Sequence, residues 1–278
     1  MGNAGPTGRT AHVESQQKTG FGIKSSMIAR ARESSVAMPF PDFSALDRVG
    51  INLHAVFACA ALPPAVQAHL RAVAPERSYR QLLLLGHGGT TLWSAVQAAG
   101  MASDHPIDDF TVGAVRHWLA DQQPAAAATF LYPGGSPPDL QTLGRLAGWH
   151  HDSPFLVGLH ADWGPWFAYR AVVLADTEFA PTELAAHMSA RSPCADCAGQ
   201  PCRSACPAHA MADGGFALAA CTRYRIQPDS ACAYTCLARL ACPVGRRHRY
   251  SEAQLRHAYA QSLEAIRRFS SPGADRTR

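Results

Sequence analysis

The residues with the clearest chemistry are cysteines, and eight of the nine in this chain lie between positions 194 and 242. Two of them, Cys206 and Cys242, are followed directly by proline. A cysteine that closes a C-x3-C step before a proline is typical of iron–sulfur ligation, because thiolates are the ligands that these clusters take. The spacing therefore predicts iron–sulfur clusters and an electron-carrying protein. The eight expected ligands are Cys194, Cys197, Cys202, Cys206, Cys221, Cys232, Cys236 and Cys242.

Eight thiolates are enough for two 4Fe-4S clusters, each of which needs four. In two-cluster ferredoxins the cysteine before proline ligates the other cluster, since the short step points it away from the preceding ligands. The ninth cysteine, Cys59, falls at the end of an expected strand, and we expect it to be a small buried hydrophobe. We expect two crossed ligand sets, namely Cys194, Cys197, Cys202 with Cys242, and Cys206 with Cys221, Cys232, Cys236.

The spacing departs from the simple ferredoxin pattern, because four residues separate Cys197 from Cys202 and five separate Cys236 from Cys242. Longer loops or one altered site would account for this. Two structural zinc sites or a set of disulfides would use the same residue type. Disulfide frameworks are typical of short secreted chains, and the N-terminus lacks a secretory apolar core. We therefore expect reduced thiols and a cytoplasmic protein.

Composition restricts the class of protein further. The chain has 278 residues, of which 47% are hydrophobic and 17% charged, so it can bury a sizeable core. Its net charge of +4 comes largely from arginine-rich stretches at 246–249 and 276–278 without interleaved aromatics, so we do not expect nucleic-acid binding. No apolar run reaches the roughly 18 residues of a membrane-spanning helix, and we expect no membrane association.

Strands alternating with helices predict an α/β layered domain over residues 45–190, after a disordered extension at 1–44. A small cysteine module should follow at 191–250, held by metal in place of a core. A C-terminal helix and tail complete the chain at 251–278. The expected strands are 51–59, 81–85, 129–132, 155–160 and 166–174, and the expected helices are 65–74, 92–101, 108–122, 138–149, 181–190 and 252–268.

Aromatic residues around 163–170 form a second candidate site. Trp163, Trp166, Phe167 and Tyr169 could line a large planar cofactor, although alternation along a strand would make half of them ordinary core. Arg170 lies in an apolar strand and needs a partner, either a polar group of a ligand or an internal aspartate.

Three further polar stretches each have a functional and a plain interpretation. The glycine turn at 86–89 could hold a phosphate or a corrinoid side chain at a helix N-terminus, but a tight turn without ligand is favoured. His150, His151 and Asp152 could act as acid, base or metal ligand, but a solvated loop is favoured. Arg246, Arg247 and Arg249 could dock an acidic redox donor, or simply begin the last helix in solvent.

The cysteine segment resembles the ferredoxin module of epoxyqueuosine reductases. That module also runs three cysteines, a Cys-Pro, an isolated cysteine (here Ala220-Cys221-Thr222-Arg223-Tyr224), a cysteine pair and a final Cys-Pro. The N-terminal portion is similar to the cobalamin-processing family CblC (MMACHC-like). The similarity is strongest from His160 to Leu174, where the family carries His-Pro-x-x-Gly-x-Trp-Phe-Ala-x-Arg-x-Val-Val-Leu, and weaker over 50–92 and 108–121.

These resemblances imply a nitroreductase-like (CblC-like) layered domain of the α+β or α/β class that binds cobalamin, followed by a ferredoxin-like module. In the CblC family the protein binds a corrinoid with its lower base detached, reduces the cobalt and removes its upper ligand. In epoxyqueuosine reductases the adjacent clusters supply the electrons to cobalamin. The implied function is an oxidoreductase fed by an external electron donor. The residues that would contact the corrinoid are His160, Trp163, Trp166, Phe167 and Arg170.

The chain also departs from both families. It has no Asp-Ser-Ala-Pro-type segment and no C-terminal helical-repeat domain for tRNA, so an epoxyqueuosine-reductase-like nucleoside reductase is a second-choice function. His160 lacks the proline that follows it in CblC, and residues 149–152 replace a tyrosine-rich stretch. The cysteine pattern is also compatible with a ferredoxin-like electron-transfer protein without corrinoid, or with a zinc-stabilised interaction module.

Overall fold

The computed structural model describes residues 39–183, 191–211 and 214–270. These described residues belong to one compact unit. The predicted extension at 1–44 lies almost wholly outside the described residues, and so does most of the predicted helix at 181–190. The domain boundaries predicted near 190 and 250 stay predictions.

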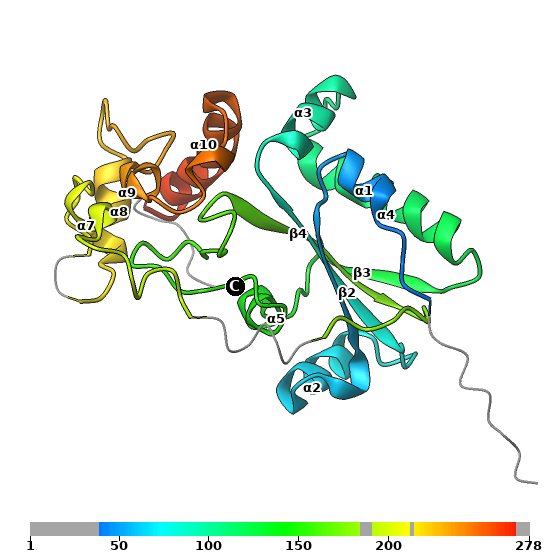
Figure 1. Cartoon of the computed structure of the whole chain (residues 1–278). Coiled ribbons are helices and arrows are strands. Elements are labelled where there is room, and N and C mark those ends of the chain that lie inside the picture. The colour runs from blue at the N-terminus through cyan, green and yellow to red at the C-terminus, as the bar shows by residue number, and fades with distance from the viewer. Residues whose placement is uncertain (1–38, 184–190, 212–213, 271–278) are drawn as a thin grey trace, which may run out of the picture. The chain divides into compact units, whose positions relative to one another are not determined.

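A four-stranded sheet forms the centre of this unit (Figure 1). Its strands are β1 (Leu53–Ala58), β2 (Gln81–Gly88), β3 (Ala128–Tyr132) and β4 (Phe167–Ala175), in the order β1-β2-β4-β3. Every neighbouring pair is antiparallel. β2 is buried along its whole length, as its apolar run predicts, because it pairs on both edges and is covered on both faces.

The fourth predicted strand, at 155–160, does not form. This segment makes only isolated bridges, between His151 and Leu159 and between His160 and Gly164. Leu156 has a φ of 61°, which breaks an extended backbone. Phe155 and Leu159 instead pack together into the core of the cysteine segment, so their alternation does not reflect a sheet face.

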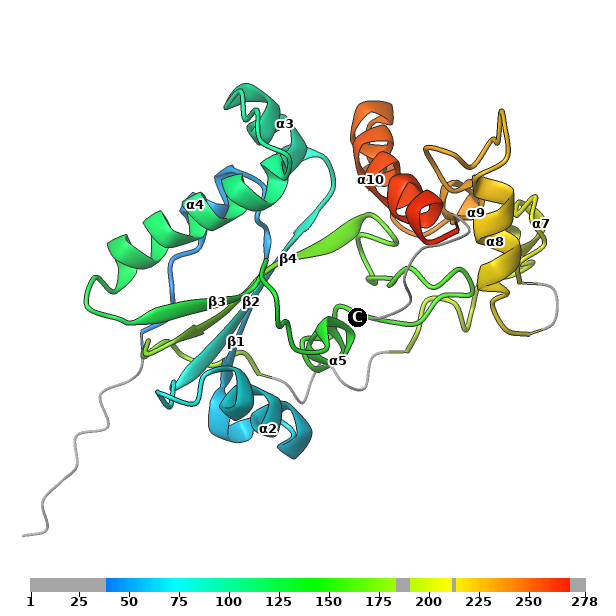
Figure 2. The ribbon, with the colours of Figure 1, turned by 180° about the vertical axis from the view of Figure 1, so that it is seen from behind.

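Helices cover both faces of the sheet (Figures 1 and 2). Alternate residues of a strand point to opposite faces, so Leu82 and Leu84 of β2 face one layer and Leu83 and Leu85 the other. The structure is thus a mixed α/β fold with an antiparallel sheet between helical layers. One layer holds α2 (Pro64–Val73) and α5 (Leu140–Leu146), and the other holds α1 (Ser44–Arg48), α3 (Thr91–Ala98) and α4 (Pro106–Gln122).

A β-bulge in β4 shapes the region where the aromatic candidates lie. Leu85 pairs with Ala171 while Gly86 pairs with Tyr169, so Arg170 has no partner residue on β2. A bulge re-aims the side chains on either side of it. Phe167 and Tyr169 therefore share a face with Val172, and Arg170 is the extra residue.

The cysteine segment folds around three short helices, α7 (Pro201–Ser204), α8 (Leu218–Arg225) and α9 (Leu237–Ala241). A 3-10 turn, η2 (Arg246–His248), then leads into the long helix α10 (Glu252–Ser270). The sequence predicts metal in place of a core here, but Met211 and Ala238 pack with Phe155 and the buried cysteines. The segment thus shares a small apolar core with the loop before β4.

Candidate functional site

The eight clustered thiols fall into two groups, and within each group nearby thiols raise one another's pKa. Burial raises the pKa of Cys194, and the nearby thiols of Cys242, Cys202 and Cys197 raise it further. Burial likewise raises the pKa of Cys221, together with Cys236, Cys206 and Cys232. Other thiols also raise the pKa of four more cysteines, and in each case the neighbour belongs to the same set. These cysteines are Cys202, Cys232, Cys236 and Cys242.

We name the two sets by their members. Thiol group 1 is Cys194, Cys197, Cys202 and Cys242, and thiol group 2 is Cys206, Cys221, Cys232 and Cys236. Their members are the same as those of the two crossed sets expected from the Cys-Pro steps, and that either set holds a cluster stays a prediction.

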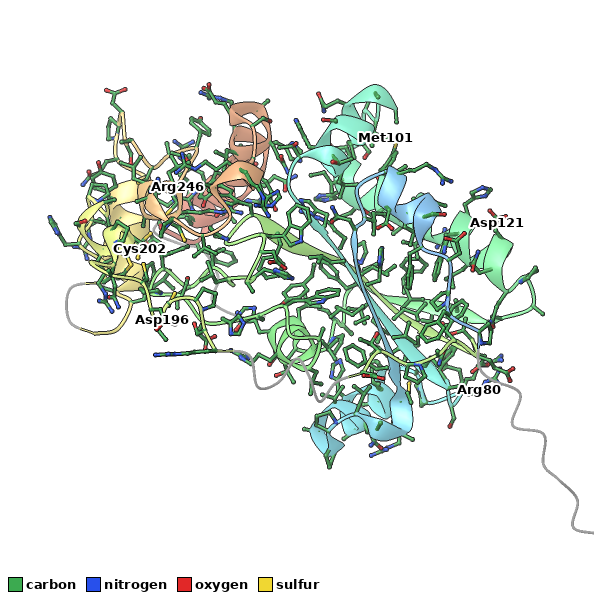
Figure 3. All side chains as sticks on the ribbon, viewed as in Figure 1. Arg80, Met101, Asp121, Asp196, Cys202 and Arg246 are labelled. Carbon is green, nitrogen blue, oxygen red and sulfur yellow. The ribbon has the colours of Figure 1, made fainter. Side chains whose placement is uncertain are left out.

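Two short helices bring about the crossing. Helix α7 carries Cys202 of group 1 and is followed by Cys206 of group 2. Helix α9 begins after Cys236 of group 2 and ends at Cys242 of group 1. The two helices are in contact, so each supplies ligand candidates to both groups. Figure 3 shows Cys202 among the side chains of these helices.

Backbone N–H groups face several of the sulfurs. Burial raises the pKa of Cys236, while the N–H groups of Arg239 and Ala238 lower it. Burial raises the pKa of Cys242, and the N–H of Val244 opposes this. Hydrogen bonds to sulfur favour the thiolate and tune metal centres that thiolates hold.

Thiols are the ligands that iron–sulfur clusters take, and all eight are half-buried or buried. Among the described residues, no group of three or more His, Cys, Asp and Glu side chains is arranged to hold a single metal ion. The ninth cysteine, Cys59, lies just after β1 in the 3-10 turn η1 (Cys59–Ala61) and is half-buried. Burial, together with Asp176, raises its pKa to about 11, so it is an unreactive thiol.

A cavity of about 580 Å³ opens against thiol group 2. All four thiols of the group line it. The rest of its wall is largely apolar, apart from the guanidinium groups of Arg225 and Arg239. The four cysteines of the group thus border one common cavity.

The predicted corrinoid contacts do not lie on one surface. His160 forms a turn, because its Nδ1 accepts the backbone N–H of Asp162 at 3.0 Å, and burial lowers its pKa to about 4. The Trp163 ring packs against the glycine turn, where a Cβ on Gly88 would lie 2.1 Å from it. The glycines at 88 and 89 thus make room for an indole, in keeping with a turn that holds no phosphate.

Trp166 and Phe167 belong to the interior. Trp166 is fully buried and meets Tyr250 edge to face, with ring centroids 5.6 Å apart. Phe167 is part of the main core on the α2 side of the sheet. Trp166 therefore cannot line a cofactor in this arrangement. Strand alternation alone could not show this, because helix α10 covers that face.

Arg170 has internal partners, as one of the two sequence interpretations predicts. Its Nε donates to Nδ1 of His87 at 2.9 Å, and Nη1 lies 3.8 Å from a carboxylate oxygen of Asp108. Burial lowers the pKa of His87 well below its usual value, and Arg170 and Arg239 act in the same direction. His87 is thus a neutral imidazole stacked on Tyr250 at 5.5 Å.

Arg170 also lines two cavities beside β4, of about 360 and 190 Å³. Tyr132 lines both as well, so the two cavities share these two side chains. Phe167, Tyr169 and His150 border the larger cavity. Asp108, His105 and His257 border the smaller one. We call the pair the β4 groove.

His150 is not the solvated loop residue that the sequence favours. It is buried, and its Nδ1 lies 3.0 Å from the hydroxyl of Tyr169. Its Nε2 lies 3.4 Å from Asp152, which accepts a 2.7 Å hydrogen bond from Arg145. Burial, with Arg145, lowers the pKa of His150. His150 and Tyr169 of this linked set line the larger cavity, so His150 is placed there as the acid or base that the sequence also offered as an interpretation.

Two arginines of the cysteine segment are buried, which is unusual for this residue type. Arg225 donates to the carbonyls of Cys232 and Tyr259 and to Ser262. Arg239 donates to the carbonyl of Pro165 through Nε at 3.1 Å and Nη2 at 2.5 Å. It also lies over the rings of Trp166 and Tyr250, at 4.7 and 4.8 Å.

None of the helices in the described part of the chain is both long and apolar enough to cross a bilayer. Comparison of the sequence with models of known families finds no match, and comparison with characterised proteins finds none either.

Comparison with solved structures finds members of both families that the sequence resembles. Epoxyqueuosine reductase from Streptococcus thermophilus matches with a TM-score of 0.43 and 12% identity, over 72% of this chain and 64% of that one. The enzyme from Bacillus subtilis matches with a TM-score of 0.46 and 10% identity, over 75% and 66%. This chain thus spans under two thirds of the length of the S. thermophilus reductase.

The C. elegans B12-trafficking protein CblC, a homologue of human MMACHC, matches with a TM-score of 0.42 and 14% identity. The match covers 81% of this chain and 92% of that one. At these identities and scores, the likenesses assign no function to this chain.

Proposed function

We propose that this chain is an iron–sulfur redox protein that holds two 4Fe-4S clusters and passes electrons to a corrinoid. The observation that carries the proposal is the division of the eight thiols into two sets of four, crossed at the two Cys-Pro steps. Thiol groups 1 and 2 would each hold one cluster. When bound, each cluster would take up and release one electron, and the cobalt of the corrinoid would be the acceptor.

The chain's own residues give each group a different setting. Group 2 faces a largely apolar cavity. Group 1 lies closer to η2, where Arg246 lowers the pKa of Cys242 against the larger effect of burial. Arg246, Arg247 and Arg249 are exposed, so an acidic external donor would dock on the group 1 side.

The β4 groove is the proposed place for the corrinoid. Arg170 offers guanidinium N–H groups to both of its cavities and could donate to the amide side chains of a corrinoid. Phe167 and Tyr169 would supply apolar contact there. Trp166 has no part in this version of the site, and Trp163 and His160 would shape the turn before β4.

Metal analysis of the anaerobically purified chain tests the cluster proposal. We expect about eight irons and a matching amount of acid-labile sulfide, four per cluster. Zinc without sulfide would disprove it and favour a structural zinc module. Disulfides would appear as a mass loss that reductant reverses.

Titration with cob(II)alamin tests the acceptor. Binding should remove the base-on absorption spectrum, and Arg170→Gln should weaken binding relative to Arg71→Gln, an exposed arginine on α2. An unchanged spectrum with clusters present would leave an electron-transfer protein without corrinoid.

A further inference from the structure

The two buried arginines of the cysteine segment are cations without an obvious anion. Arg225 and Arg239 are only 8% and 7% exposed. Among the described residues, neither forms an ion pair with a carboxylate; their partners are backbone carbonyls, hydroxyl groups and aromatic rings, none of which carries a negative charge. Burying a charge is costly unless an opposite charge offsets it. The fold therefore implies an anion close to both.

Thiol group 2 is the candidate anion that both arginines approach. Arg225 and Arg239 line the same cavity as all four of its sulfurs. Arg225 donates to the carbonyl of Cys232, and Arg239 follows Cys236 on helix α9. Four thiolates around an iron–sulfur core carry a net negative charge, which these guanidiniums would offset at close range.

Within the described ranges, no buried arginine lies beside thiol group 1 as Arg225 and Arg239 lie beside thiol group 2. The arginines beside it there are Arg203, which is half-buried and bonded to Gln200, and Arg246, which is exposed. Solvent and salt screen an exposed charge far more than a buried one. The two groups therefore differ in the cationic field around their sulfurs, although they share the same ligand chemistry.

We propose that Arg225 and Arg239 are built-in counter-charges that make the cluster of thiol group 2 the more easily reduced of the two. Reduction adds one electron, and so one negative charge, to the bound group. A fixed cation stabilises that added charge, most strongly where water is excluded. The inference rests on the proposed function, since it presupposes a cluster at each group.

The position of Arg239 gives this difference a direction. The guanidinium that faces group 2 also bonds to Pro165, just before β4, and stacks on Trp166 and Tyr250. Tyr250 stacks in turn on His87, the partner of Arg170. Arg239 thus links thiol group 2 to the residues at the start of β4, while exposed arginines lie beside thiol group 1.

An anaerobic redox titration of the full, cluster-loaded chain, followed by EPR, tests this proposal. Arg239→Gln and Arg225→Gln should each lower the equilibrium constant for reduction of one cluster about tenfold. For a one-electron couple this lowers the reduction potential of that cluster by about 59 mV. The cluster affected should be the more easily reduced one of the unaltered protein. Cys221→Ser, which changes a group 2 ligand, identifies its EPR signal.

Two controls separate charge from packing. Arg239→Lys keeps the cation but loses the paired bonds to Pro165, so it should shift the potential less than Arg239→Gln. Arg246→Gln removes a surface cation beside Cys242 and should leave the group 2 cluster unchanged. If Arg239→Gln does not load with metal, Arg225→Gln decides, because it leaves α9 intact.

Unchanged potentials in both glutamine variants, or equal shifts in both clusters, would overturn the inference. A group 2 cluster that is the harder one to reduce would overturn it as well. A chain without iron and sulfide would instead disprove the proposed function, so the two failures are distinguishable.

Discussion

At the scale of single residues, the clearest result is that sequence order and spatial grouping of the thiols differ. Cys206 follows Cys202 closely along the chain, yet the two belong to different groups. Cys202 raises the pKa of Cys242, and Cys206 raises the pKa of Cys221. The sequence predicts this crossing from the proline that follows Cys206, because ligand chemistry permits few arrangements at such spacing.

Serine substitutions check the crossing. Cys194→Ser and Cys242→Ser should alter the EPR signal of one cluster, and Cys206→Ser and Cys221→Ser that of the other, because serine replaces a thiolate ligand by a hydroxyl. Cys59→Ser should leave both signals unchanged. Matching effects of Cys202→Ser and Cys206→Ser would contradict the crossed assignment.

The contact between His150 and Tyr169 leads to a second expectation at this scale. Tyr169→Phe removes the hydroxyl at 3.0 Å and leaves a buried imidazole nitrogen without its partner. We expect the free energy of unfolding to fall by about 1–3 kcal/mol. Denaturant titration measures this, with Tyr234→Phe as a control on an exposed ring. Equal stabilities of the two variants would show that the hydroxyl is dispensable.

At the scale of elements, two glycines allow the turn before β4 and the loop after Cys242 to meet backbone to backbone. A Cβ on Gly164 would lie 2.1 Å from the carbonyl oxygen of Val244, and one on Gly245 would lie 2.3 Å from that of Trp163. Both glycines have positive φ, 59° and 65°. Side chains are excluded from this contact for both steric and conformational reasons.

Gly245→Ala should therefore destabilise the chain by more than backbone strain alone. Gly199→Ala is the matched control, since Gly199 has a φ of 71° and no atom within 4 Å of its would-be Cβ. We expect Gly199→Ala to cost about 1–2 kcal/mol and Gly245→Ala clearly more, measured as the free energy of unfolding. A smaller loss of unfolding free energy for Gly245→Ala than for Gly199→Ala would show that the backbone at this contact can move apart at little cost.

The elements also show how far sequence reasoning reaches. The apolar run at 81–85 predicts a doubly covered strand correctly, because burial on both faces requires apolar residues at every position. The strand predicted from the alternation at 155–160 is wrong, because the same pattern arises when Phe155 and Leu159 pack on the cysteine segment. Strand order and the bulge at Arg170 depend on long-range pairing that no local pattern carries.

In the candidate site, too, local features can be predicted from the sequence and long-range contacts cannot. Ligand spacing is a local property, so the sequence predicts the two thiol sets, and their role as cluster ligands stays a prediction. The placement of Trp166 and His150 depends on which distant element covers them. For His150 the decisive neighbour is Gly158, where a Cβ would lie 2.6 Å from the imidazole Nδ1. A glycine in a loop does not reveal such a neighbour in the sequence.

At the scale of the whole molecule, several histidines are held neutral inside the fold. Burial is the main cause of the lowered pKa values of His54, His87, His150 and His160, the last to about 4. In the unfolded chain these groups titrate near 6.5. The unfolded state therefore binds protons that the folded state does not as pH falls.

Stability should consequently be greatest above about pH 6.5 and should decline from there toward pH 4. Denaturant titrations at half-unit intervals measure this decline. His160→Asn, which can still accept the turn hydrogen bonds, should flatten part of it. A free energy of unfolding that stays constant between pH 7 and 4.5 would contradict this expectation.

The sharing of helices α7 and α9 by both thiol groups has a consequence for how the protein is made. Because each helix contributes to both groups, filling one of them would fix the backbone that carries ligands of the other. Cofactor insertion in the cell should then be cooperative. Native mass spectrometry of iron-limited preparations should show empty and fully assembled chains, with few half-assembled ones.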